Sequence, residues 1–398
     1  MNVFLRSIRI GKWQVPFPVF LWFTLAVVAV SLELSRGEEH FNNFLLYRHV
    51  FLHTLDQVNL YKGEPFHLFD NHYGPFFSII IAPFSFFGNY AGCFLWCVAN
   101  AWILYYAISR LALTQNQKLM ILLVSALEMM TAIHSVQFNP MLAGWIIMAY
   151  VLTEKEKDFW ATLFIVAGFL VKLYGIVGIV FFFFSKHKPK FVWSFFFWLI
   201  VLFCLPMLIS SPAFVVQSYG DWYESLRTKD ALNTDGAASG FMQDISVMGM
   251  IRRIGGIDIS NTLVILPAAL VYAFPLVRVK QFFQPGFRLA YLALALIGIV
   301  IFSSSAESPT YVIAMVGASI WYVIQPDANK KWAGALLLFA FILTSLSPTD
   351  LFPRYLREQY VRPYSLKALP CFIIWLVIAV QLIRHTVGFR KERALYKA

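Results

Sequence analysis

Two ionisable residues stand inside apolar runs of the sequence, where a charge is costly and marks a candidate functional position. Glu128 lies in VSALEMMTAIHSVQFNP and Lys172 lies in FLVKLYGIVG. The ammonium group of Lys172 could meet a lipid phosphate as a point charge, or the two residues could pair and neutralise each other. A helix break near Lys172 and Gly175 would suit a protein-lined cavity, which favours the phosphate interpretation.

Carboxylates gather in the stretch 33–74, between the first apolar segment and the second, and Glu39 and Asp70 are among them. A carboxylate at the boundary of water and membrane can take a proton from a sugar hydroxyl while a lipid-linked donor approaches from the bilayer. Asp70 leads through LFDNHYGPFF into the second apolar segment, so capping of the next helix explains it equally well. His49, His53 and Asp56 follow helical spacing, but a solvated helix face accounts for them and we assign no metal site.

Amides and hydroxyls supply further candidates. Gln137 and Asn139 belong to the QFNP turn, where amides can hydrogen-bond sugar hydroxyls, although a tight polar turn needs no ligand to explain it. Glu307 and Tyr311 belong to SSSAESPTY, where the acid can cap a helix start. The additional hydroxyls in that segment favour a functional role as well.

The segment 211–259 is long and mainly polar. Trp222 in this segment can stack on a sugar face, and Arg252 and Arg253 can meet phosphate or acceptor groups. Aromatic residues at a membrane edge are also ordinary interface anchors, so the ring alone does not indicate a sugar site.

Composition defines the scaffold that must position these residues. Of 398 residues, 59% are hydrophobic and 13% are charged, and the mean hydropathy is +0.67. These values lie far outside the range of soluble domains, and the long apolar segments exclude the short alternating strands of a β-barrel. We therefore expect an all-α polytopic membrane protein that forms a single domain over residues 1–398. The net charge of +11 does not indicate nucleic acid, because most basic residues fall beside apolar segments.

About 20 residues are needed to cross a bilayer as a helix, and on that basis the sequence predicts about twelve transmembrane helices. They fall near 16–34, 74–88, 90–109, 118–134, 139–153, 159–185, 191–210, 260–277, 288–303, 308–323, 332–348 and 368–385. The segment 159–185 is long enough to be tilted or broken. In the stretch 33–74, apolar residues recur at helical spacing (Phe41, Phe44, Leu45, Phe51, Leu52, Leu55 and Val58), which predicts an amphipathic helix on the membrane surface.

Charge predicts the orientation of these helices. With the amino terminus in the cytoplasm, the inward loops include the basic run at 185–190, Lys330 and Lys331, and a basic tail. Of the 21 acidic residues, only Asp327 and Glu392 then fall inside. We therefore expect a multi-pass protein of the cytoplasmic (inner) membrane, with both termini cytoplasmic and an extracytoplasmic active site.

The segment 137–191, QFNPMLAGWIIMAYVLTEKEKDFWATLFIVAGFLVKLYGIVGIVFFFFSKHKPKF, resembles the core of glycosyltransferase family 87. Members of that family carry a Gln-x-Asn turn, a span, an intramembrane Lys and a basic loop. The similarity extends to NNFLLYRHVFLHTLDQVNLYK, FDNHYGPFF, DISVMGMIRRIGG and AESPTYVIAMVGASIWYV. The resemblance implies a GT-C-type helical bundle, a polyprenyl-phosphate sugar donor, inversion at the anomeric centre and a lipid or glycan acceptor. No cofactor is expected.

One position departs from the family pattern. The family segment Asp-hydrophobic-x-x-Tyr, whose Asp usually serves as general base, has Asn43 in the place of the acid. An amide cannot accept the proton, so either Asp70 or Glu39 takes that role or the protein is a catalytically altered member. The remaining residues are expected to hold the donor phosphate (Lys172, Arg252 and Arg253) and to position sugar or acceptor (Asn43, Gln137, Asn139, Glu307, Tyr311 and Trp222).

These observations favour a membrane-embedded hexosyltransferase, with mannose as the expected sugar. A transporter or flippase of lipid-linked sugars is the alternative from another class, and it would use Lys172 and Glu128 as substrate or proton contacts. The sequence shows no related halves in matching positions, which argues against a transporter built from repeats. A non-catalytic membrane scaffold is the third possibility.

Overall fold

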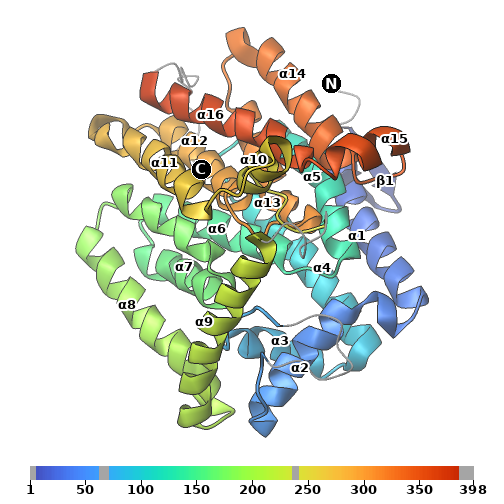
Figure 1. Cartoon of the computed structure of the whole chain (residues 1–398). Helices are drawn as coiled ribbons and strands as arrows, with labels where there is room; N and C mark the ends of the chain where they lie inside the picture. Colours follow the sequence, from blue (N-terminus) through green and yellow to red (C-terminus); the bar gives the residue numbers. More distant parts are fainter. Residues whose placement is uncertain (1–5, 62–70, 235–241, 385–398) are drawn as a thin grey trace. The chain divides into compact units, whose positions relative to one another are not determined.

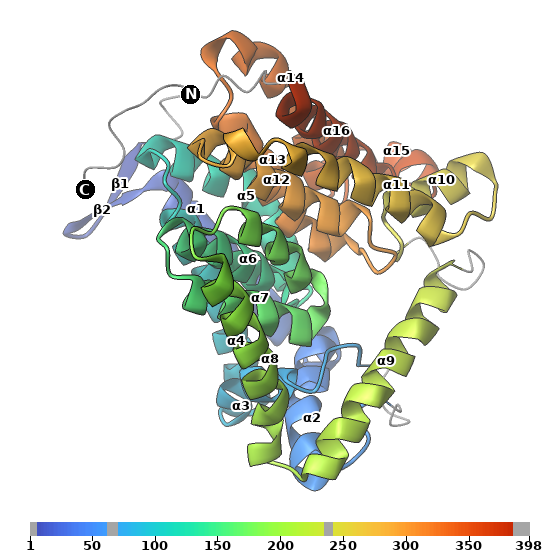
Figure 2. The same cartoon turned by 90° about the vertical axis from the view of Figure 1, so that its left-hand side faces the viewer.

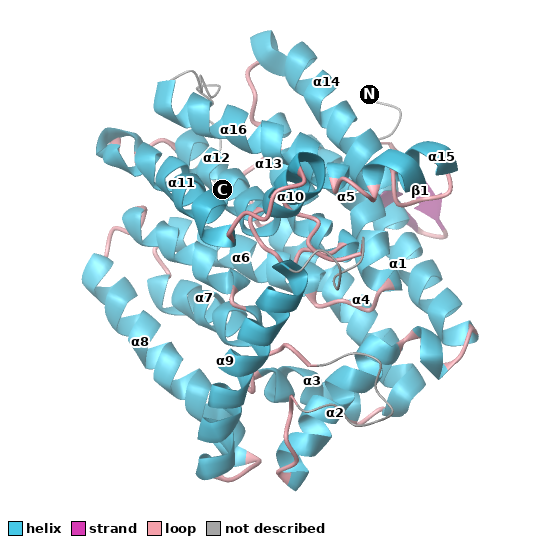
Figure 3. Ribbon diagram, in the orientation of Figure 1, coloured by secondary structure: helices cyan, strands magenta, loops and turns pink. Residues whose placement is uncertain are grey.

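The computed structural model describes residues 6–61, 71–234 and 242–384, and it is dominated by helices (Figures 1 and 3). The chain divides into two compact units. Unit 1 comprises Met1–Trp22, Ile108–Thr131 and Asp230–Ala398, and unit 2 comprises Phe23–Ala107 and Ala132–Lys229. The two units are described separately below.

Unit 2 is built from helices that follow the apolar segments of the sequence. Its elements are the greater part of α1 (Phe17–Ser35), η2 (Glu38–His40), α2 (Asn42–Asp56), α3 (Phe77–Ser85), α4 (Gly88–Ser109), α6 (Asn139–Glu154), α7 (Asp158–Lys172), η3 (Tyr174–Phe183), α8 (Lys188–Cys204), η4 (Leu205–Leu208) and α9 (Pro212–Thr234). Helix α7 packs against α6, η3 and α8, and α6, α7 and α8 lie side by side in Figures 1 and 2. The core of this unit therefore surrounds α7.

Helix α7 and the 3-10 helix η3 form an antiparallel hairpin. A Cβ on Gly168 would lie 3.0 Å from the Cα of Gly175, and one on Gly178 would lie 2.9 Å from Cγ1 of Ile165. In a continuous helix two residues seven positions apart would be separated by about 10 Å. The close approach of the two glycine backbones therefore shows that the chain reverses after Lys172.

The fold-back corrects the prediction of one crossing over 159–185. At the open end of the hairpin, Oε1 of Glu156 lies 2.5 Å from Nζ of Lys186, and Oε2 lies 3.5 Å from Nε2 of His187. The acidic turn before α7 and the basic loop after η3 thus lie at the same end of the unit. The predicted orientation had put Glu156 on the opposite side from that loop, because it counted the segment as a single span.

The prediction of a span over 74–88 is also wrong. Helix α3 has 9 residues, which cover only about 14 Å at 1.5 Å per residue. Helix α2 confirms the predicted helix in the first loop. Its buried residues are Phe44, Tyr47, Val50, Phe51 and Thr54, whereas Leu55 and Val58 are exposed, so the buried face is rotated from the one that the apolar residues predicted.

Unit 1 contains the elements β1 (Ser7–Ile10), β2 (Trp13–Pro16), most of α5 (Gln115–His134), α10 (Val247–Gly255), α11 (Asn261–Ala273), η5 (Phe274–Val277), η6 (Val279–Gln281), α12 (Pro285–Ile301), η7 (Ser308–Thr310), α13 (Tyr311–Val323), η8 (Asp327–Asn329), α14 (Lys330–Ala340), the π-helix η9 (Phe341–Leu346), α15 (Arg354–Leu356), the π-helix η10 (Arg357–Val361), η11 (Leu366–Ala368) and α16 (Leu369–Arg384). Helix α12 packs against α13 and α16. Nearly every residue of α12 and α13 is buried, so these two helices form the core of the unit.

The described helices fit a membrane-embedded protein. Five helices within the described ranges are long and apolar enough to cross a membrane: Phe17–Ser35, Gly88–Ser109, Gln115–His134, Lys188–Leu208 and Leu366–Arg384. Shorter apolar helices include Asn261–Val277, Pro285–Ile301 and Ser308–Val323. An all-helical membrane protein is thus supported, and the exact number of crossings stays a prediction.

The described part of the chain departs from an all-α structure at one place. Strands β1 and β2 pair as an antiparallel hairpin just before α1, drawn in magenta in Figure 3. The sequence predicted no strand here and placed only the first span, near 16–34.

Candidate functional site

The tip of the α7–η3 hairpin carries Lys172, the last residue of α7. Its Nζ donates a hydrogen bond of 2.8 Å to Oδ1 of Asn139. The same nitrogen lies 5.9 Å from the ring centroid of Tyr73 and 5.1 Å from that of Tyr174, within the range of cation–π attraction. Three segments that are distant in sequence thus meet at one cation.

Asn139 is the first residue of α6 and is 1% exposed. Its Oδ1 accepts from Lys172, while its Nδ2 has no hydrogen-bond partner within the described residues. A buried amide N–H without an acceptor is costly, because it has given up its hydrogen bonds to water. The tip therefore holds both a cation and a vacant donor, which is a combination that suits an anionic oxygen.

The segment after Asp70 closes over the hairpin tip. The backbone nitrogen of Gly74 donates to the carbonyl of Val171 over 3.0 Å. A Cβ on Gly74 would lie 2.0 Å from the carbonyl oxygen of Leu170, so only glycine allows this approach. Leu173, just past the tip, has φ of 28°, which is unusual for a branched side chain.

A chain of hydroxyls and an amide connects this segment to the QFNP turn. The hydroxyl oxygens of Tyr47 and Tyr73 lie 3.0 Å apart. The Tyr73 hydroxyl also donates to Oε1 of Gln137 over 3.3 Å. Gln137 and Asn139, which the sequence analysis placed in one turn, are therefore at the same end of unit 2 as Lys172.

Asn43, Glu39 and Asp70 are the residues that the sequence analysis considered in connection with the catalytic base. Nδ2 of Asn43 donates to the carbonyl of Ser135 over 2.8 Å, so this amide fastens α2 to the turn before α6. Glu39 is exposed in η2. Asp70 lies outside the described residues.

Helix α9 is fastened to the same segment through two of its residues. Nε1 of Trp222 donates to the carbonyl of His72 over 2.9 Å. Nδ1 of His72 lies 2.9 Å from Oγ of Ser225. The Trp222 ring is 6% exposed, so in this structure it packs against the segment rather than presenting a face to a sugar.

The imidazole of His72 is neutral near pH 7. Burial, and next the positive charges of Lys229 and Lys172, lower its pKa to about 3. His72 therefore adds no positive charge to the tip.

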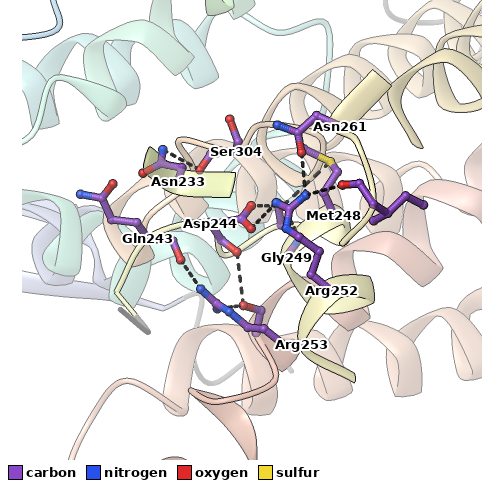
Figure 4. A network of polar contacts seen from close by, with 12 residues as sticks. Asn233, Gln243, Asp244, Met248, Gly249, Arg252, Arg253, Asn261 and Ser304 are labelled. Carbon is purple, nitrogen blue, oxygen red and sulfur yellow. Dashed lines mark hydrogen bonds and ion pairs between the residues drawn. The ribbon is translucent and has the colours of Figure 1, made fainter. Parts of the chain in front are cut away.

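In unit 1, Arg252 belongs to a polar network that Figure 4 shows. Its Nη2 lies 2.5 Å from Oδ2 of Asp244, and its Nη1 donates to Oδ1 of Asn261 over 2.8 Å. Oγ of Ser246 donates to the other oxygen of Asp244 over 2.6 Å. Burial raises the pKa of the Asp244 carboxyl even with these partners. Arg252 thus fixes the start of α11 to the segment before α10.

Arg253 is anchored in the same network. Its Nη2 donates to the carbonyl of Gln243 over 2.8 Å, and its Nη1 donates to Oγ of Ser365. Burial lowers the pKa of this guanidinium group from its usual value. Nδ2 of Asn233 joins the end of α9 to the carbonyl of Ser304 over 3.0 Å (Figure 4).

Glu307 and Tyr311 lie where the sequence analysis expected a helix start. Glu307 and Thr310 form a capping box at η7, with the Glu307 nitrogen 3.2 Å from Oγ1 of Thr310. Tyr311 is fully buried, and its hydroxyl donates to the carbonyl of Ile245 over 2.7 Å. The capping function of Glu307 is confirmed, and contact of either residue with a substrate stays a prediction.

The ion-pair partner of Glu128 is Lys367. Its Oε1 lies 2.8 Å from Nζ of Lys367, and both side chains are buried. That nitrogen also donates to Oγ of Ser308 over 2.8 Å. Neutralisation of Glu128 by Lys172 was the alternative that the sequence left open, and the pair with Lys367 replaces it.

Several of these residues were missed by the sequence analysis. In the sequence, Tyr47 is an aromatic residue of the predicted surface helix, and Tyr73 is an aromatic residue of the loop that follows it. Asp244 was only part of a quoted motif. Lys367 lies just before a predicted span, where a lysine is typical of the interface between membrane and water. A signal for Asp244 was available in the spacing of DISVMGMIRR, because an acid eight residues before an arginine can meet it across a capped turn.

The fold and the site define a class of protein: a helical, membrane-embedded protein with a cation and a vacant amide donor at the tip of a helical hairpin. Residues 71–348 match the family model of glycosyltransferase family 87. The chain belongs to this family, which indicates a glycosyltransferase acting with a sugar donor and an acceptor. A comparison with curated proteins found no match.

Proposed function

We propose that the protein is a hexosyltransferase of the GT-C type, with residues 1–398 acting as one domain. It transfers a sugar, with mannose as the expected one, from a polyprenyl phosphate to a lipid or glycan acceptor on the extracytoplasmic side of the inner membrane. The observation that supports this most is the placement of Lys172 beside the vacant Nδ2 of Asn139 at the hairpin tip.

Lys172 and Asn139 would bind the donor phosphate. An ammonium supplies a point charge, and the amide N–H supplies a directed hydrogen bond to a phosphate oxygen. The negative charge on the phosphate oxygens grows as the sugar–phosphate bond breaks, so groups fixed beforehand at this position stabilise the transition state more than the ground state. The backbone contacts of the tip provide that fixation.

In the proposed step, an acceptor hydroxyl oxygen attacks the anomeric carbon from the face opposite the phosphate. Its proton passes to a carboxylate, the bond between the anomeric carbon and the phosphate oxygen breaks, and polyprenyl phosphate leaves with the electron pair. The configuration inverts because attack and departure occur on opposite faces. Asp70 is the preferred base, with Glu39 as the alternative, because the residues that follow Asp70 are anchored at the tip.

The other candidates take supporting roles in this proposal. Gln137 and Asn43 position sugar or acceptor near the tip. Trp222 acts indirectly, through its hydrogen bond to the carbonyl of His72. Arg252, Arg253, Glu307 and Tyr311 all belong to unit 1. Their assignments from the sequence, the two arginines to the donor phosphate and the other two residues to sugar or acceptor, stay predictions.

Transfer by purified protein tests the proposal. The protein in detergent or vesicles is incubated with polyprenyl-phosphate sugars and a membrane-lipid extract, and released polyprenyl phosphate and glycosylated product are measured together. Both should form in equal amounts, and Asp70→Asn should abolish them while Glu39→Gln should not. Reconstituted vesicles that move the lipid-linked sugar without forming product would instead favour the flippase. Equal rates in Asp70→Asn and wild type would overturn the choice of base.

A further inference from the structure

The hairpin before α1 has two unlike faces. Its register pairs Ile8 with Val15 and Arg9 with Gln14. Residues paired across an antiparallel hairpin share a face, and faces alternate along each strand. Ile8, Trp13 and Val15 therefore lie on one face, and Arg9 and Gln14 lie on the other. The hairpin is amphipathic although it is only two strands wide.

Its apolar face is open. Trp13 is 77% exposed, which is among the highest values for a large side chain in the described residues. Ile8 and Val15 are only half-buried. An indole of this size left in water would forfeit much of the free energy that burial provides, so the face is suited to a partner with an apolar layer.

The charges of the hairpin are of one sign. Arg6, Arg9 and Lys12 are exposed, and the first acidic residue of the chain is Glu33. Lys12 lies in the two-residue turn, where Gly11 has φ of 59°. The hairpin thus carries three exposed cations, with Arg9 on the face opposite the indole, and has no nearby counter-charge along the sequence.

The hairpin is joined directly to a helix that is long enough to span. β2 ends at Pro16 and α1 begins at Phe17. The nitrogen of Phe17 donates to the carbonyl of Arg6 over 2.8 Å, which ties the first strand to the start of the helix. Figure 2 shows the hairpin at this end of α1. A spanning α1 therefore delivers the hairpin to the membrane surface.

We propose that the hairpin Ser7–Pro16 is a docking element for anionic phospholipid at the membrane surface where α1 begins. The indole of Trp13 enters the boundary between head groups and acyl chains, and Arg6, Arg9 and Lys12 bind lipid phosphates. An amphipathic basic segment has the chemistry for such a surface, and each cation near an anionic leaflet favours binding. This role is independent of the transfer reaction.

Fluorescence of Trp13 tests the insertion. Full-length wild type and Trp13→Phe are reconstituted in phosphatidylcholine vesicles with and without phosphatidylglycerol, using lipids brominated near the head-group end of the chain. The wild-type signal minus the Trp13→Phe signal should be quenched by bromine and shielded from aqueous acrylamide. Trp102→Phe is the control, because Trp102 is exposed on the spanning helix α4 and its difference signal should be quenched with either lipid. A Trp13 signal that acrylamide quenches and bromine does not would overturn the proposal.

Charge variants test the lipid preference. In Arg9→Gln/Lys12→Gln, half-maximal bromine quenching of Trp13 should need a higher phosphatidylglycerol content, because binding weakens about fivefold for each cation removed. The matched control Lys190→Gln/Lys331→Gln removes the same charge from exposed lysines elsewhere and should leave this value unchanged. Equal quenching with and without phosphatidylglycerol would show that the cations do not select anionic lipid and would contradict the proposal.

Discussion

Nζ of Lys172 lies 2.8 Å from Oδ1 of Asn139, and these two residues are the last of α7 and the first of α6. The bond uses the acceptor of the amide, and the amide donor Nδ2 has no hydrogen-bond partner within the described residues. In the proposed function, the pair is one anion-binding unit, and its geometry is set by two helix ends.

Asn139→Asp should weaken donor binding without unfolding the protein. The new carboxylate would pair with Lys172 at the existing distance, remove the amide donor and repel a phosphate. Because a hydrogen bond to a charged group contributes about 1.5–3 kcal/mol, KM for the polyprenyl-phosphate sugar should rise about 10- to 100-fold. Titration of transfer rate against donor concentration measures this, with Asn116→Asp as a control on an exposed amide in α5. An unchanged KM would exclude Asn139 from the phosphate site.

Gly74→Ala should disturb the closure of the 71–74 segment over the hairpin tip. Its Cβ would lie 2.0 Å from the carbonyl oxygen of Leu170, and such overpacking costs about 1–3 kcal/mol. The temperature of thermal unfolding and the transfer rate should both fall. Gly220→Ala is the matched control in helix α9, since nothing lies within 4 Å of its Cβ position and alanine favours helix by about 1 kcal/mol. Equal stability of the two variants would show that the segment does not depend on this contact.

Breaking the buried pair of Glu128 and Lys367 should destabilise unit 1. Removal of one member leaves an unpaired buried charge, at a cost of about 3–5 kcal/mol. Glu128→Leu and Lys367→Met should each unfold earlier on heating in detergent, whereas the double variant should recover most of the loss. If the single and double variants are equally unstable, the stabilising contact is packing rather than charge pairing.

Because of His72, the free energy of unfolding of the protein should decrease as the pH is lowered. Its pKa is about 3 in the folded protein and near 6.5 when unfolded. The unfolded state therefore binds the proton first, so the contribution is fully present above pH 6.5 and is lost as the pH falls toward 3. The slope is at most about 1.4 kcal/mol per pH unit. The midpoint of denaturant unfolding should drop between pH 6.5 and 4.5 more in wild type than in His72→Asn, and parallel pH profiles would contradict the shift.

Much of the helical framework was predictable, because apolar length alone marks helices in a membrane protein. The reversal of the chain after Lys172 was harder to predict from the sequence. The segment 159–185 is continuously apolar, and what breaks it is the contact between the backbones of Gly168 and Gly175, which depends on tertiary packing. The β-hairpin at 7–16 was missed since its basic residues are equally typical of a topology signal.

The site was predictable by residue type but not by partner. Lys172 was singled out from the cost of a charge inside an apolar run, and Gln137 and Asn139 were singled out as amides of the QFNP turn. The structure brings all three to one end of unit 2. Pairing was a different matter: Glu128 meets Lys367, 239 positions away in the sequence, and no local spacing encodes such a contact. Arg252 and Asp244, by contrast, are only eight positions apart, so their spacing was a signal that the sequence offered.

Binding of polyprenyl phosphate to Lys172 variants tests the central claim most directly. The account predicts that Lys172→Met loses affinity for polyprenyl phosphate and lowers the transfer rate about 100- to 1,000-fold, that Lys172→Arg retains part of both, and that Lys331→Met, which removes an exposed lysine, retains both. All three must show the same thermal unfolding as wild type within a few degrees. Wild-type affinity for polyprenyl phosphate in a folded Lys172→Met protein would contradict the account.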